Sequence, residues 1–226
     1  MQRIIKITDD GSPTFYVPYL NEYYHSLYGA RDESEHVFIE NGFRKSDKKV
    51  VSVFEVGLGT GLNAWLTCLE AEKSDRTVVY HSVELFPLER AEWSQFEKHL
   101  GADKPNSFFR KIHECSWGAE TAISSRFRIK KIICDITGYE TASKYDIVYF
   151  DAFGPDVQPE MWTVEIFSKI SSMMSDGGLL STYSSKGEVR RNMQAGGLRV
   201  IRVPGPRGKR QITLAFKSFE EPNKTK

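Results

Sequence analysis

The sequence has few cysteines and histidines, the residues that form disulfides and bind metal ions in small proteins. It has three cysteines in 226 residues, Cys68, Cys115 and Cys134, and none of them stands in C-x-x-C spacing. An odd number without that spacing argues against both a disulfide framework and a zinc site. The five histidines are scattered and form no H-E-x-x-H pair, so no metal is predicted.

Long apolar runs are absent as well. No apolar stretch approaches the roughly 18 residues that a membrane span requires, and the N-terminus carries no apolar core of a signal peptide. We therefore expect a cytoplasmic protein that has no membrane partner. With 40% hydrophobic and 27% charged residues, the composition is that of an ordinary globular domain.

Strand-like and helix-like segments alternate along most of the chain. We expect strands at 50–56, 77–83, 129–134, 146–150 and 178–183, and helices at 62–72, 87–99, 117–124 and 159–174. This alternation predicts an α/β fold with a mostly parallel, doubly wound sheet. Two more strands, 198–203 and 211–216, are joined by the Pro- and Gly-rich loop 204–210. They predict an antiparallel hairpin that closes one edge of the sheet.

The chain is expected to form one main domain with two appendages. The main domain covers residues 50–217, and residues 218–226 should form a flexible tail. Residues 1–49 are less regular and should pack on the main domain as an N-terminal extension. Several tyrosines gather there near His25, namely Tyr16, Tyr19, Tyr23, Tyr24 and Tyr28.

The most informative segment follows the apolar run 50–54. It reads Glu55-Val-Gly57-Leu-Gly59-Thr60-Gly61-Leu-Asn63. At a strand-to-helix turn, alternating glycines let the backbone pass close to a nucleotide-like ligand. The spacing is G-x-G-x-G rather than G-x-G-x-x-G, and no Gly-Lys-Ser/Thr follows, which disfavours a dinucleotide or a nucleoside triphosphate without excluding either. We infer S-adenosylmethionine as the ligand, and the alternative is a Gly-rich turn in an unrelated α/β protein.

Acidic residues mark the ends of four predicted strands: Glu55, Glu84, Asp135 and Asp151. In a doubly wound sheet, ligands bind at the carboxyl ends of the strands. Glu84 is suited to accept hydrogen bonds from ribose hydroxyls, and its alternative is an acid at the start of the next helix. Asp135 either accepts from the exocyclic amine of adenine or caps the turn that follows it. Glu55 is expected to orient the glycine loop by accepting backbone N–H groups rather than to touch the substrate.

A second informative segment begins at Asp151. Residues 151–162 read Asp-Ala-Phe-Gly-Pro-Asp-Val-Gln-Pro-Glu-Met-Trp. A carboxylate that precedes an aromatic residue and a Gly-Pro turn can hold a substrate amine while an aromatic face packs on a base. Phe153 and Trp162 are therefore candidates for stacking, although both residue types ordinarily belong to the core. The alternative for Asp151 is a cap that precedes a rigid loop.

Basic residues gather towards the C-terminus. Residues 186–226 hold 11 Lys/Arg and three Asp/Glu, although the whole chain has a net charge of only +1. Such a segment predicts a footprint for a phosphate backbone, and a solvated face is the alternative. The residues that we assign to RNA contact are Arg190, Arg191, Arg207, Lys209 and Arg210.

Together these segments resemble the methyltransferase domain of the bifunctional tRNA wobble-uridine modification enzymes of the MnmC family, or the stand-alone form of that domain. The matching segments are the glycine loop, Glu84-Leu-Phe-Pro-Leu88, Asp151-Ala-Phe-Gly-Pro155, Pro159-Glu-Met-Trp162, Ser184-Ser-Lys-Gly-Glu-Val-Arg-Arg191 and Gly205-Pro-Arg-Gly-Lys-Arg210. The resemblance covers about residues 9–217. It implies a Rossmann-like class I S-adenosylmethionine-dependent methyltransferase fold.

The resemblance also implies a reaction and its residues. The expected reaction is N-methylation of 5-aminomethyl-(2-thio)uridine at the wobble position, in the anticodon loop of tRNA. Asp151 is the expected catalytic residue, and Phe153, Trp162 and Tyr183 are expected beside the base. S-adenosylmethionine is expected to contact Glu55, Gly57, Gly59, Thr60, Gly61, Asn63, Glu84 and Asp135. An FAD-dependent oxidase domain does not fit in 226 residues, so we expect a functional link to separate enzymes that install the aminomethyl group.

Two other classes of function remain open. A small-molecule amine methyltransferase or an aminopropyltransferase on the same fold would also hold an amine with acids at strand ends. Such an enzyme would not need the basic C-terminal hairpin. A non-catalytic RNA-binding module would keep the fold and bind tRNA without transferring a methyl group.

Overall fold

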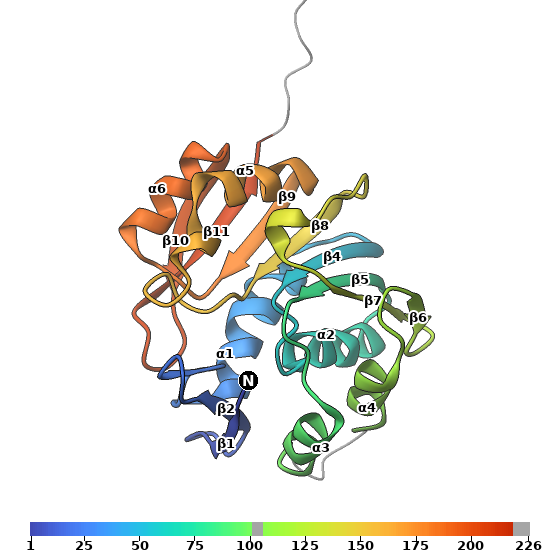
Figure 1. Cartoon of the computed structure of the whole chain (residues 1–226). Coiled ribbons are helices and arrows are strands. Elements are labelled where there is room, and N and C mark those ends of the chain that lie inside the picture. Colours follow the sequence, from blue (N-terminus) through green and yellow to red (C-terminus); the bar gives the residue numbers. More distant parts are fainter. Residues whose placement is uncertain (101–105, 219–226) are drawn as a thin grey trace, which may run out of the picture.

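A central β-sheet organises the computed structural model, which describes residues 1–100 and 106–218 (Figure 1). Within these residues the eight strands of the sheet run in the order β10-β11-β9-β8-β4-β5-β7-β6. The neighbouring strands from β9 to β7 in this order are parallel, and they are β4 (Val50–Val56), β5 (Thr77–Glu84), β7 (Phe127–Ile133), β8 (Tyr145–Phe150) and β9 (Met174–Thr182). The structure thus confirms the predicted α/β fold with a mostly parallel sheet.

The predicted C-terminal hairpin is present. Strands β10 (Leu198–Pro204) and β11 (Gln211–Lys217) pair antiparallel along their whole length. Strand β11 also pairs antiparallel with β9, which leaves β10 at the edge of the sheet. The hairpin loop that joins β10 to β11 therefore emerges beside the carboxyl end of β9.

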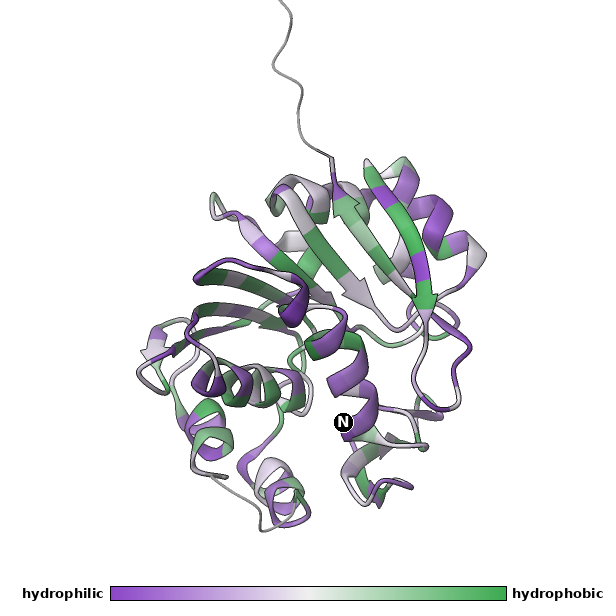
Figure 2. Ribbon diagram, turned by 180° about the vertical axis from the view of Figure 1, so that it is seen from behind, coloured by the Kyte–Doolittle hydropathy of each residue, from purple (hydrophilic) through white to green (hydrophobic). Residues whose placement is uncertain are grey.

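Helices cover both faces of the sheet (Figure 1). One face carries α2 (Leu62–Lys73) with α3 (Arg90–Lys98) and α4 (Asn106–Glu114), and the other carries α5 (Val164–Met173) and α6 (Gly187–Ala195). Alternate residues of β4 supply the two cores, because Val51 and Val53 pack on the side of α2 whereas Phe54 and Val56 pack on the side of α5. Hydrophobic residues concentrate in these central strands (Figure 2). In the described part of the chain, no helix is long and apolar enough to cross a membrane.

The N-terminal segment packs on the α2 side of the sheet. Its strands β1 (Ile4–Ile7), β2 (Pro13–Val17) and β3 (Glu22–Tyr23) form a small antiparallel sheet, which α1 (Ala30–Ser34) and the π-helical turn Glu35–Glu40 follow. Val37, Phe38 and Phe43 are buried in the same apolar cluster as α2. The Ser181 hydroxyl of β9 donates a hydrogen bond of 2.6 Å to the Val37 carbonyl oxygen. The division of the chain at residues 49 and 217 stays a prediction, and residues 219–226 of the predicted tail lie outside the described residues.

Several element predictions were wrong. The helix expected at 117–124 is instead a strand, β6 (Glu120–Ala122), which pairs antiparallel with β7. Gly118 has a φ of +81°, which lies outside the helical region. Pairing with β7 then makes residues 120–122 a strand. The helix lies earlier, as α4, and α6 was not expected at all.

Two other helices begin later than expected. The segment expected to be helical from residue 159 starts as a 3-10 turn (Pro159–Trp162), and α5 begins after Thr163. The Thr163 hydroxyl oxygen accepts a hydrogen bond of 3.4 Å from the Ile166 N–H, so this residue caps the helix. Helix α3 begins at Arg90 rather than at Pro87, because Glu89 and Glu92 form a capping box there.

Phe38→Ala tests whether the N-terminal segment is part of the common core. Phe38 is 1% exposed, and its ring centre lies 5.0 Å from that of Tyr149. The substitution should lower the free energy of unfolding by about 3–5 kcal/mol because it leaves a cavity in the core. The control Tyr19→Ala alters a residue that is 89% exposed, so its effect should stay within about 0.5 kcal/mol. Urea unfolding measures both, and an equally small effect of Phe38→Ala would contradict this packing.

Candidate active site

The two informative segments of the sequence meet where the order of the strands reverses. The chain places β5 and β7 on one side of β4, and it places β8 and β9 on the other side. The glycine loop follows β4 and Asp151 follows β8, so both lie at the carboxyl ends of neighbouring parallel strands. This is the place where open α/β sheets bind their ligands. A cavity of about 700 Å³ opens there.

The loop Gly57–Gly61 lies close against its surroundings. Gly57, Gly59 and Gly61 have φ values of +89°, +50° and +74°, which favour glycine. A Cβ atom on Gly57 would lie 2.8 Å from the Asp151 carbonyl oxygen, and one on Gly61 would lie 2.8 Å from His113 Nε2. The Gly57 N–H donates to the Val83 carbonyl oxygen at 3.0 Å. The loop is therefore held against the backbone of Asp151, and larger residues do not fit there.

Glu84 ends β5 and fastens the loop from the other side. Its carboxylate accepts hydrogen bonds from the Gly59 N–H at 2.9 Å and from the Phe86 N–H at 2.8 Å. Each oxygen accepts one of these two bonds, which leaves each with a further lone pair. Glu84 lines the cavity and is half-buried. The alternative role at a helix start does not apply, because α3 begins only at Arg90.

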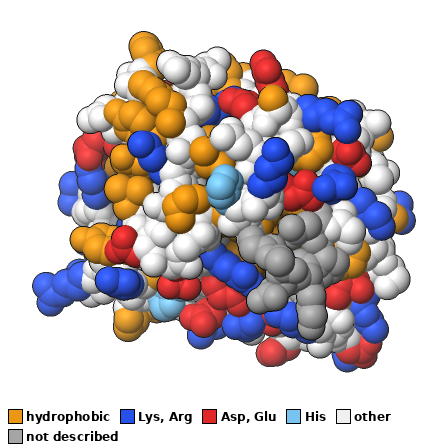
Figure 3. Space-filling model, turned by 90° about the horizontal axis from the view of Figure 1, so that it is seen from below, with side chains coloured by type: hydrophobic (Ala, Val, Ile, Leu, Met, Phe, Trp, Pro, Cys, Tyr) orange, Lys and Arg blue, Asp and Glu red, His pale blue; other side chains and the backbone are white. Residues whose placement is uncertain are grey.

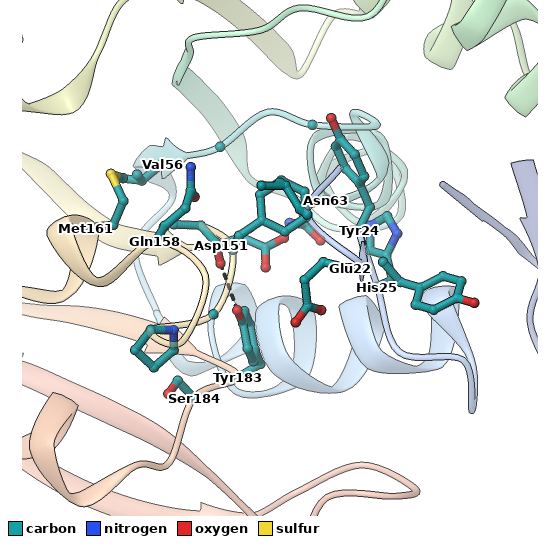
Figure 4. Close-up of a pocket in the computed structure, with 18 of the residues that line it drawn as sticks. Glu22, Tyr24, His25, Val56, Asn63, Asp151, Gln158, Met161, Tyr183 and Ser184 are labelled. Carbon is teal, nitrogen blue, oxygen red and sulfur yellow. Dashed lines mark hydrogen bonds between the residues drawn. The ribbon is translucent and has the colours of Figure 1, made fainter. Parts of the chain in front are cut away.

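Asn63 bridges two carboxyl groups, and one of them belongs to Asp151, which lies beside it in the cavity (Figure 4). Its Nδ2 donates to Asp151 Oδ2 at 2.8 Å and to Glu55 Oε1 at 3.1 Å. Asn63 is 3% exposed because it sits in the first turn of α2, directly above the end of β4. Asp151 and Asn63 line the cavity, whereas Glu55 is fully buried behind them. The arrangement fixes one oxygen of Asp151 and leaves Oδ1 for a ligand.

The enclosed position of these carboxyl groups changes their acidity. Burial raises the pKa of Asp151 to about 7, and the hydrogen bond from Asn63 and the Lys209 ammonium act in the opposite direction. Burial also raises the pKa of Glu55 to about 8, and the neighbouring Asp151 charge adds to this. Near neutral pH, Asp151 can therefore gain or release a proton, which is the property that a general base requires.

The N-terminal segment builds one wall of the cavity. The Tyr24 hydroxyl oxygen accepts a hydrogen bond of 2.8 Å from Arg3 Nε, and the Tyr24 ring meets Phe153 edge-on at 5.1 Å. His25 bridges the Thr14 and Thr60 hydroxyls at 3.2 and 3.3 Å, and burial lowers its pKa to about 4. His25 is therefore neutral and structural at pH 7. The cluster of tyrosines near His25 was the only sign in the sequence that this segment reaches the cavity.

The loop of the C-terminal hairpin builds the opposite wall. Lys209 Nζ lies 4.1 Å from the centre of the Tyr183 ring and 2.5 Å from Glu33 Oε1 of α1. Glu33 also accepts a hydrogen bond of 2.7 Å from the Ser26 N–H. Tyr183 donates its hydroxyl hydrogen to the Ala152 carbonyl oxygen at 2.8 Å, next to Asp151 (Figure 4). Nothing in the sequence marked Glu33, because its partners come from distant segments.

Two site predictions need correction. Trp162 is 2% exposed, and its Nε1 donates to the Phe153 carbonyl oxygen at 2.8 Å. It is a core residue among Phe150, Phe167 and Tyr183, and it cannot reach a base. Glu55 accepts hydrogen bonds from Asn63 and from the Ser82 hydroxyl, not from the backbone of the loop, because its side chain points toward α2. Lys209 pairs with Glu33, and its contact with a phosphate stays a prediction.

Some of the other predicted residues line the cavity, and some do not. Asp135 Oδ1 accepts from the N–H and the hydroxyl of Thr137, both at 2.8 Å, so the capping role is present. Its contact with adenine stays a prediction. Phe153, Tyr183 and Arg210 line the cavity, whereas Arg207 lies in the hairpin loop and Arg190 and Arg191 lie on α6.

The comparisons with known proteins agree with this geometry. A family model described as S-adenosyl-L-methionine-dependent methyltransferase matches residues 106–218, which is half of the chain. The chain belongs to this family of methyltransferases. S-adenosylmethionine is therefore the cofactor of the enzyme.

The methyltransferase is also similar to bifunctional proteins named MnmC, for tRNA 5-methylaminomethyl-2-thiouridine biosynthesis. It is 27% identical to the protein of Hahella chejuensis over 238 residues, which cover 96% of this chain and 37% of the relative. It is 29% identical to that of Pseudomonas savastanoi pv. phaseolicola over 207 residues, which cover 82% of this chain and 30% of the relative. The chain thus spans about a third of the length of these relatives.

Solved structures lead to the same family. The crystal structure of MNMC2 from Aquifex aeolicus matches with a TM-score of 0.73 and 26% identity, over 98% of this chain and 72% of that chain. An S-adenosylmethionine-dependent methyltransferase from Clostridium acetobutylicum shares the fold, with a TM-score of 0.50 and 11% identity over 84% of this chain and 92% of that chain. The methyltransferase thus has the Rossmann-like class I fold and resembles the methyltransferase domain of MnmC.

The residues around the cavity fit S-adenosylmethionine. The glycine loop forms a cradle in which Cβ atoms would collide with Asp151 and His113. Glu84 keeps lone pairs for ribose hydroxyls, and Asn63 Oδ1 is a buried acceptor without a partner among the described residues. The volume of about 700 Å³ lies within the range of about 300–1,000 Å³ that ligand pockets usually have.

Gly57→Ala tests the cradle. The left-handed backbone costs a residue with a Cβ about 1–2 kcal/mol, and at Gly57 the new atom also meets the Asp151 carbonyl oxygen. We expect binding of S-adenosylmethionine to weaken by about tenfold or more, the equivalent of one lost hydrogen bond. Gly118→Ala is the matched control, because Gly118 has a φ of +81° but nothing within 4 Å of a Cβ. Calorimetric titration that finds equal affinities for the two variants would refute the cradle.

Proposed function

We propose that this methyltransferase methylates the primary amine of 5-aminomethyl-(2-thio)uridine at the wobble position of tRNA, which yields 5-methylaminomethyl-(2-thio)uridine. The observation that carries the proposal is the place of Asp151, whose carboxyl group lines the cavity while its backbone touches Gly57 of the cofactor loop. The relatives named for tRNA 5-methylaminomethyl-2-thiouridine biosynthesis support this substrate.

Asp151 binds the substrate amine and accepts its proton. Because Asn63 occupies Oδ2, Oδ1 accepts a hydrogen bond from the amine and aligns its lone pair. S-adenosylmethionine, when bound, supplies a methyl group on a sulfonium whose sulfur keeps the electron pair of the broken S–C bond. As the new N–C bond forms, the nitrogen becomes acidic and Asp151 takes up its proton. The raised pKa of Asp151, about 7, suits this transfer.

The walls of the cavity suit a base that is turned out of a single-stranded loop. Phe153 lines the cavity next to Asp151, and Tyr24 meets its ring edge-on. Tyr183 stands on the opposite wall, with the Lys209 ammonium over its ring. Aromatic faces of this kind stack on unpaired bases. We assign the base to the space between Phe153 and Tyr183.

The hairpin loop supplies the contact with the tRNA backbone. Arg207 and Arg210 are exposed there, and Arg210 also lines the cavity. On the face seen from below, Lys/Arg and Asp/Glu side chains are interspersed (Figure 3). The anticodon loop thus enters beside the hairpin. A cytoplasmic location and a functional link to enzymes that install the aminomethyl group stay predictions.

The direct test uses labelled S-adenosylmethionine and tRNA that bears 5-aminomethyluridine. After digestion to nucleosides, we expect label in 5-methylaminomethyluridine, and tRNA without the aminomethyl group serves as the control. Absence of the labelled nucleoside would refute the proposal. Label on a free small amine instead would identify a small-molecule methyltransferase, and tRNA binding without label would identify a binding module.

Asp151→Asn separates chemistry from cofactor binding. The substitution removes the proton acceptor but keeps the shape, so kcat should fall by about 100- to 10,000-fold while the affinity for S-adenosylmethionine stays nearly unchanged. In the wild type, kcat/KM should rise with pH through about 7, because Asp151 accepts a proton only when it is ionised. That limb should vanish in Asp151→Asn, whereas a limb that belongs to the substrate amine should persist. A variant with unchanged turnover would remove Asp151 from the mechanism.

Arg207→Ala combined with Arg210→Ala tests the hairpin loop. Loss of two phosphate contacts should weaken tRNA binding and should lower the slope of log affinity against log salt by about two. The control Arg128→Ala alters an exposed residue of β7 that pairs with Glu120. Filter binding at several salt concentrations measures both variants. An unchanged slope in the double variant would place the tRNA on another face.

A further inference from the structure

Glu55 has no direct role in the reaction above, yet it is the most enclosed acid of the site. It lies on β4 on the same side as Val51 and Val53, and it is 0% exposed. The groups that face it are polar but carry no positive charge: Asn63 from α2, Tyr80 and Ser82 from β5, Tyr149 from β8, and Asp151. An ionised carboxylate in such a place is costly, because no cation compensates for its lost hydration.

Burial raises the pKa of Glu55 more than the hydrogen bonds that this carboxyl group accepts lower it. Oε1 accepts from Asn63 Nδ2 at 3.1 Å, and Oε2 accepts from the Ser82 hydroxyl at 2.8 Å. The Tyr80 hydroxyl is buried beside Glu55 and has no hydrogen-bond partner among the described residues. An oxygen of either hydroxyl can accept the proton of a carboxylic acid.

Asp151 and Glu55 share one amide, so they do not ionise independently. Burial raises the pKa of both carboxyl groups, and Asp151 is the one that lines the cavity. A charge on Asp151 opposes ionisation of Glu55. The other groups that face Asp151 are Glu33 from α1, Lys209 from the hairpin loop and Tyr183 after β9.

The side-chain amide of Asn63 can rotate about its last bond. Its orientation decides whether the donor Nδ2 or the acceptor Oδ1 faces the Asp151 carboxyl group. In the structure Nδ2 faces both carboxyl groups, and Oδ1 has no partner among the described residues. Without an acceptor at the position of Glu55, the amide loses one of its two hydrogen bonds. Asp151 Oδ2 is then no longer reliably occupied, and its two oxygens compete for the amine.

We propose that Glu55 is a positioning residue that acts as a neutral carboxylic acid: it holds the amide of Asn63 so that Asp151 Oδ2 stays occupied and Oδ1 faces the substrate amine. The inference rests on the proposed role of Asp151 in the transfer. It assigns Glu55, Asn63 and Asp151 to one chain of hydrogen bonds that runs from the core to the cavity.

Two substitutions at Glu55 separate the roles of shape, hydrogen bonding and charge. Glu55→Gln keeps an acceptor for Asn63 and a donor for Ser82 or Tyr80, so kcat and the pH profile should stay near those of the wild type. Glu55→Met keeps the length but removes the acceptor, so kcat should fall roughly tenfold to hundredfold through misplacement of Asp151. In Glu55→Met, the rise of kcat/KM with pH should move to higher pH, because the hydrogen bond from Asn63 holds the pKa of Asp151 down. Binding of S-adenosylmethionine should be retained.

Glu97→Met is the matched control. Glu97 is also a buried acid, 7% exposed, but it lies on α3 and pairs with Arg110 at 3.0 Å. The Glu97→Met variant should unfold more easily than the wild type, but the pH dependence of its kcat/KM should not shift. If Glu55→Met keeps the kcat and the pH profile of the wild type, the positioning role is wrong. If Glu55→Gln is impaired as much as Glu55→Met, the neutral-acid role is wrong.

Infrared difference spectroscopy of the wild type against Glu55→Gln at pH 7 gives a readout that needs neither tRNA nor turnover. We expect the C=O band of a neutral carboxylic acid that disappears in the variant, and a carboxylate band in its place would overturn the inference. This measurement decides the matter even if Glu55→Met does not fold. Failure of the wild type to methylate the tRNA would refute the proposed function instead, and it would leave the infrared result intact.

Discussion

The close approach of Gly57 to the Asp151 backbone is the constraint on which the site depends. Strands β4 and β8 are neighbours at the point where the strand order reverses, so their two loops must share the same space. The absence of a side chain at Gly57 allows that contact, because a Cβ would lie 2.8 Å from the Asp151 carbonyl oxygen. The glycine loop, which we assign to the cofactor, and the carboxyl group proposed to hold the amine are thereby set at a fixed separation. For a transfer reaction, such positioning accounts for much of the rate.

The segments outside the parallel sheet add walls to this junction and so form the cavity. The N-terminal segment brings Tyr24 and His25 to one wall, and the hairpin loop brings Lys209 to the other. The pair between Lys209 and Glu33 joins the two walls. Enclosure has a direct chemical effect, since it raises the pKa of Asp151 to about 7. Parts of the chain that lie far from each other in sequence thus decide the acidity of one carboxyl group.

Much of this could be predicted from the sequence where the signal is local. Apolar runs that end in an acid located the parallel strands and placed Glu84 and Asp151 at their carboxyl ends, and the G-x-G-x-G loop indicated the cofactor. Tertiary effects could not be predicted in the same way. Residues 117–124 have helical propensity, but pairing with β7 makes part of them a strand. Trp162 looked like a stacking residue because of its neighbours in sequence, whereas its packing against Phe150 and Phe167 places it in the core. The link from Asn63 to Glu55 depends on side-chain direction, which a linear pattern does not show.

The central claim is that Asp151 holds the substrate amine beside the cofactor loop. The most direct measurement is a crystal structure of the protein with S-adenosylhomocysteine and the 5-aminomethyluridine nucleoside. The account predicts the adenosine moiety against residues 57–61 with its ribose on Glu84, and the amine nitrogen within hydrogen-bond distance of Asp151 Oδ1. An amine that binds elsewhere in the cavity, with Asp151 directed only at Asn63, would contradict it.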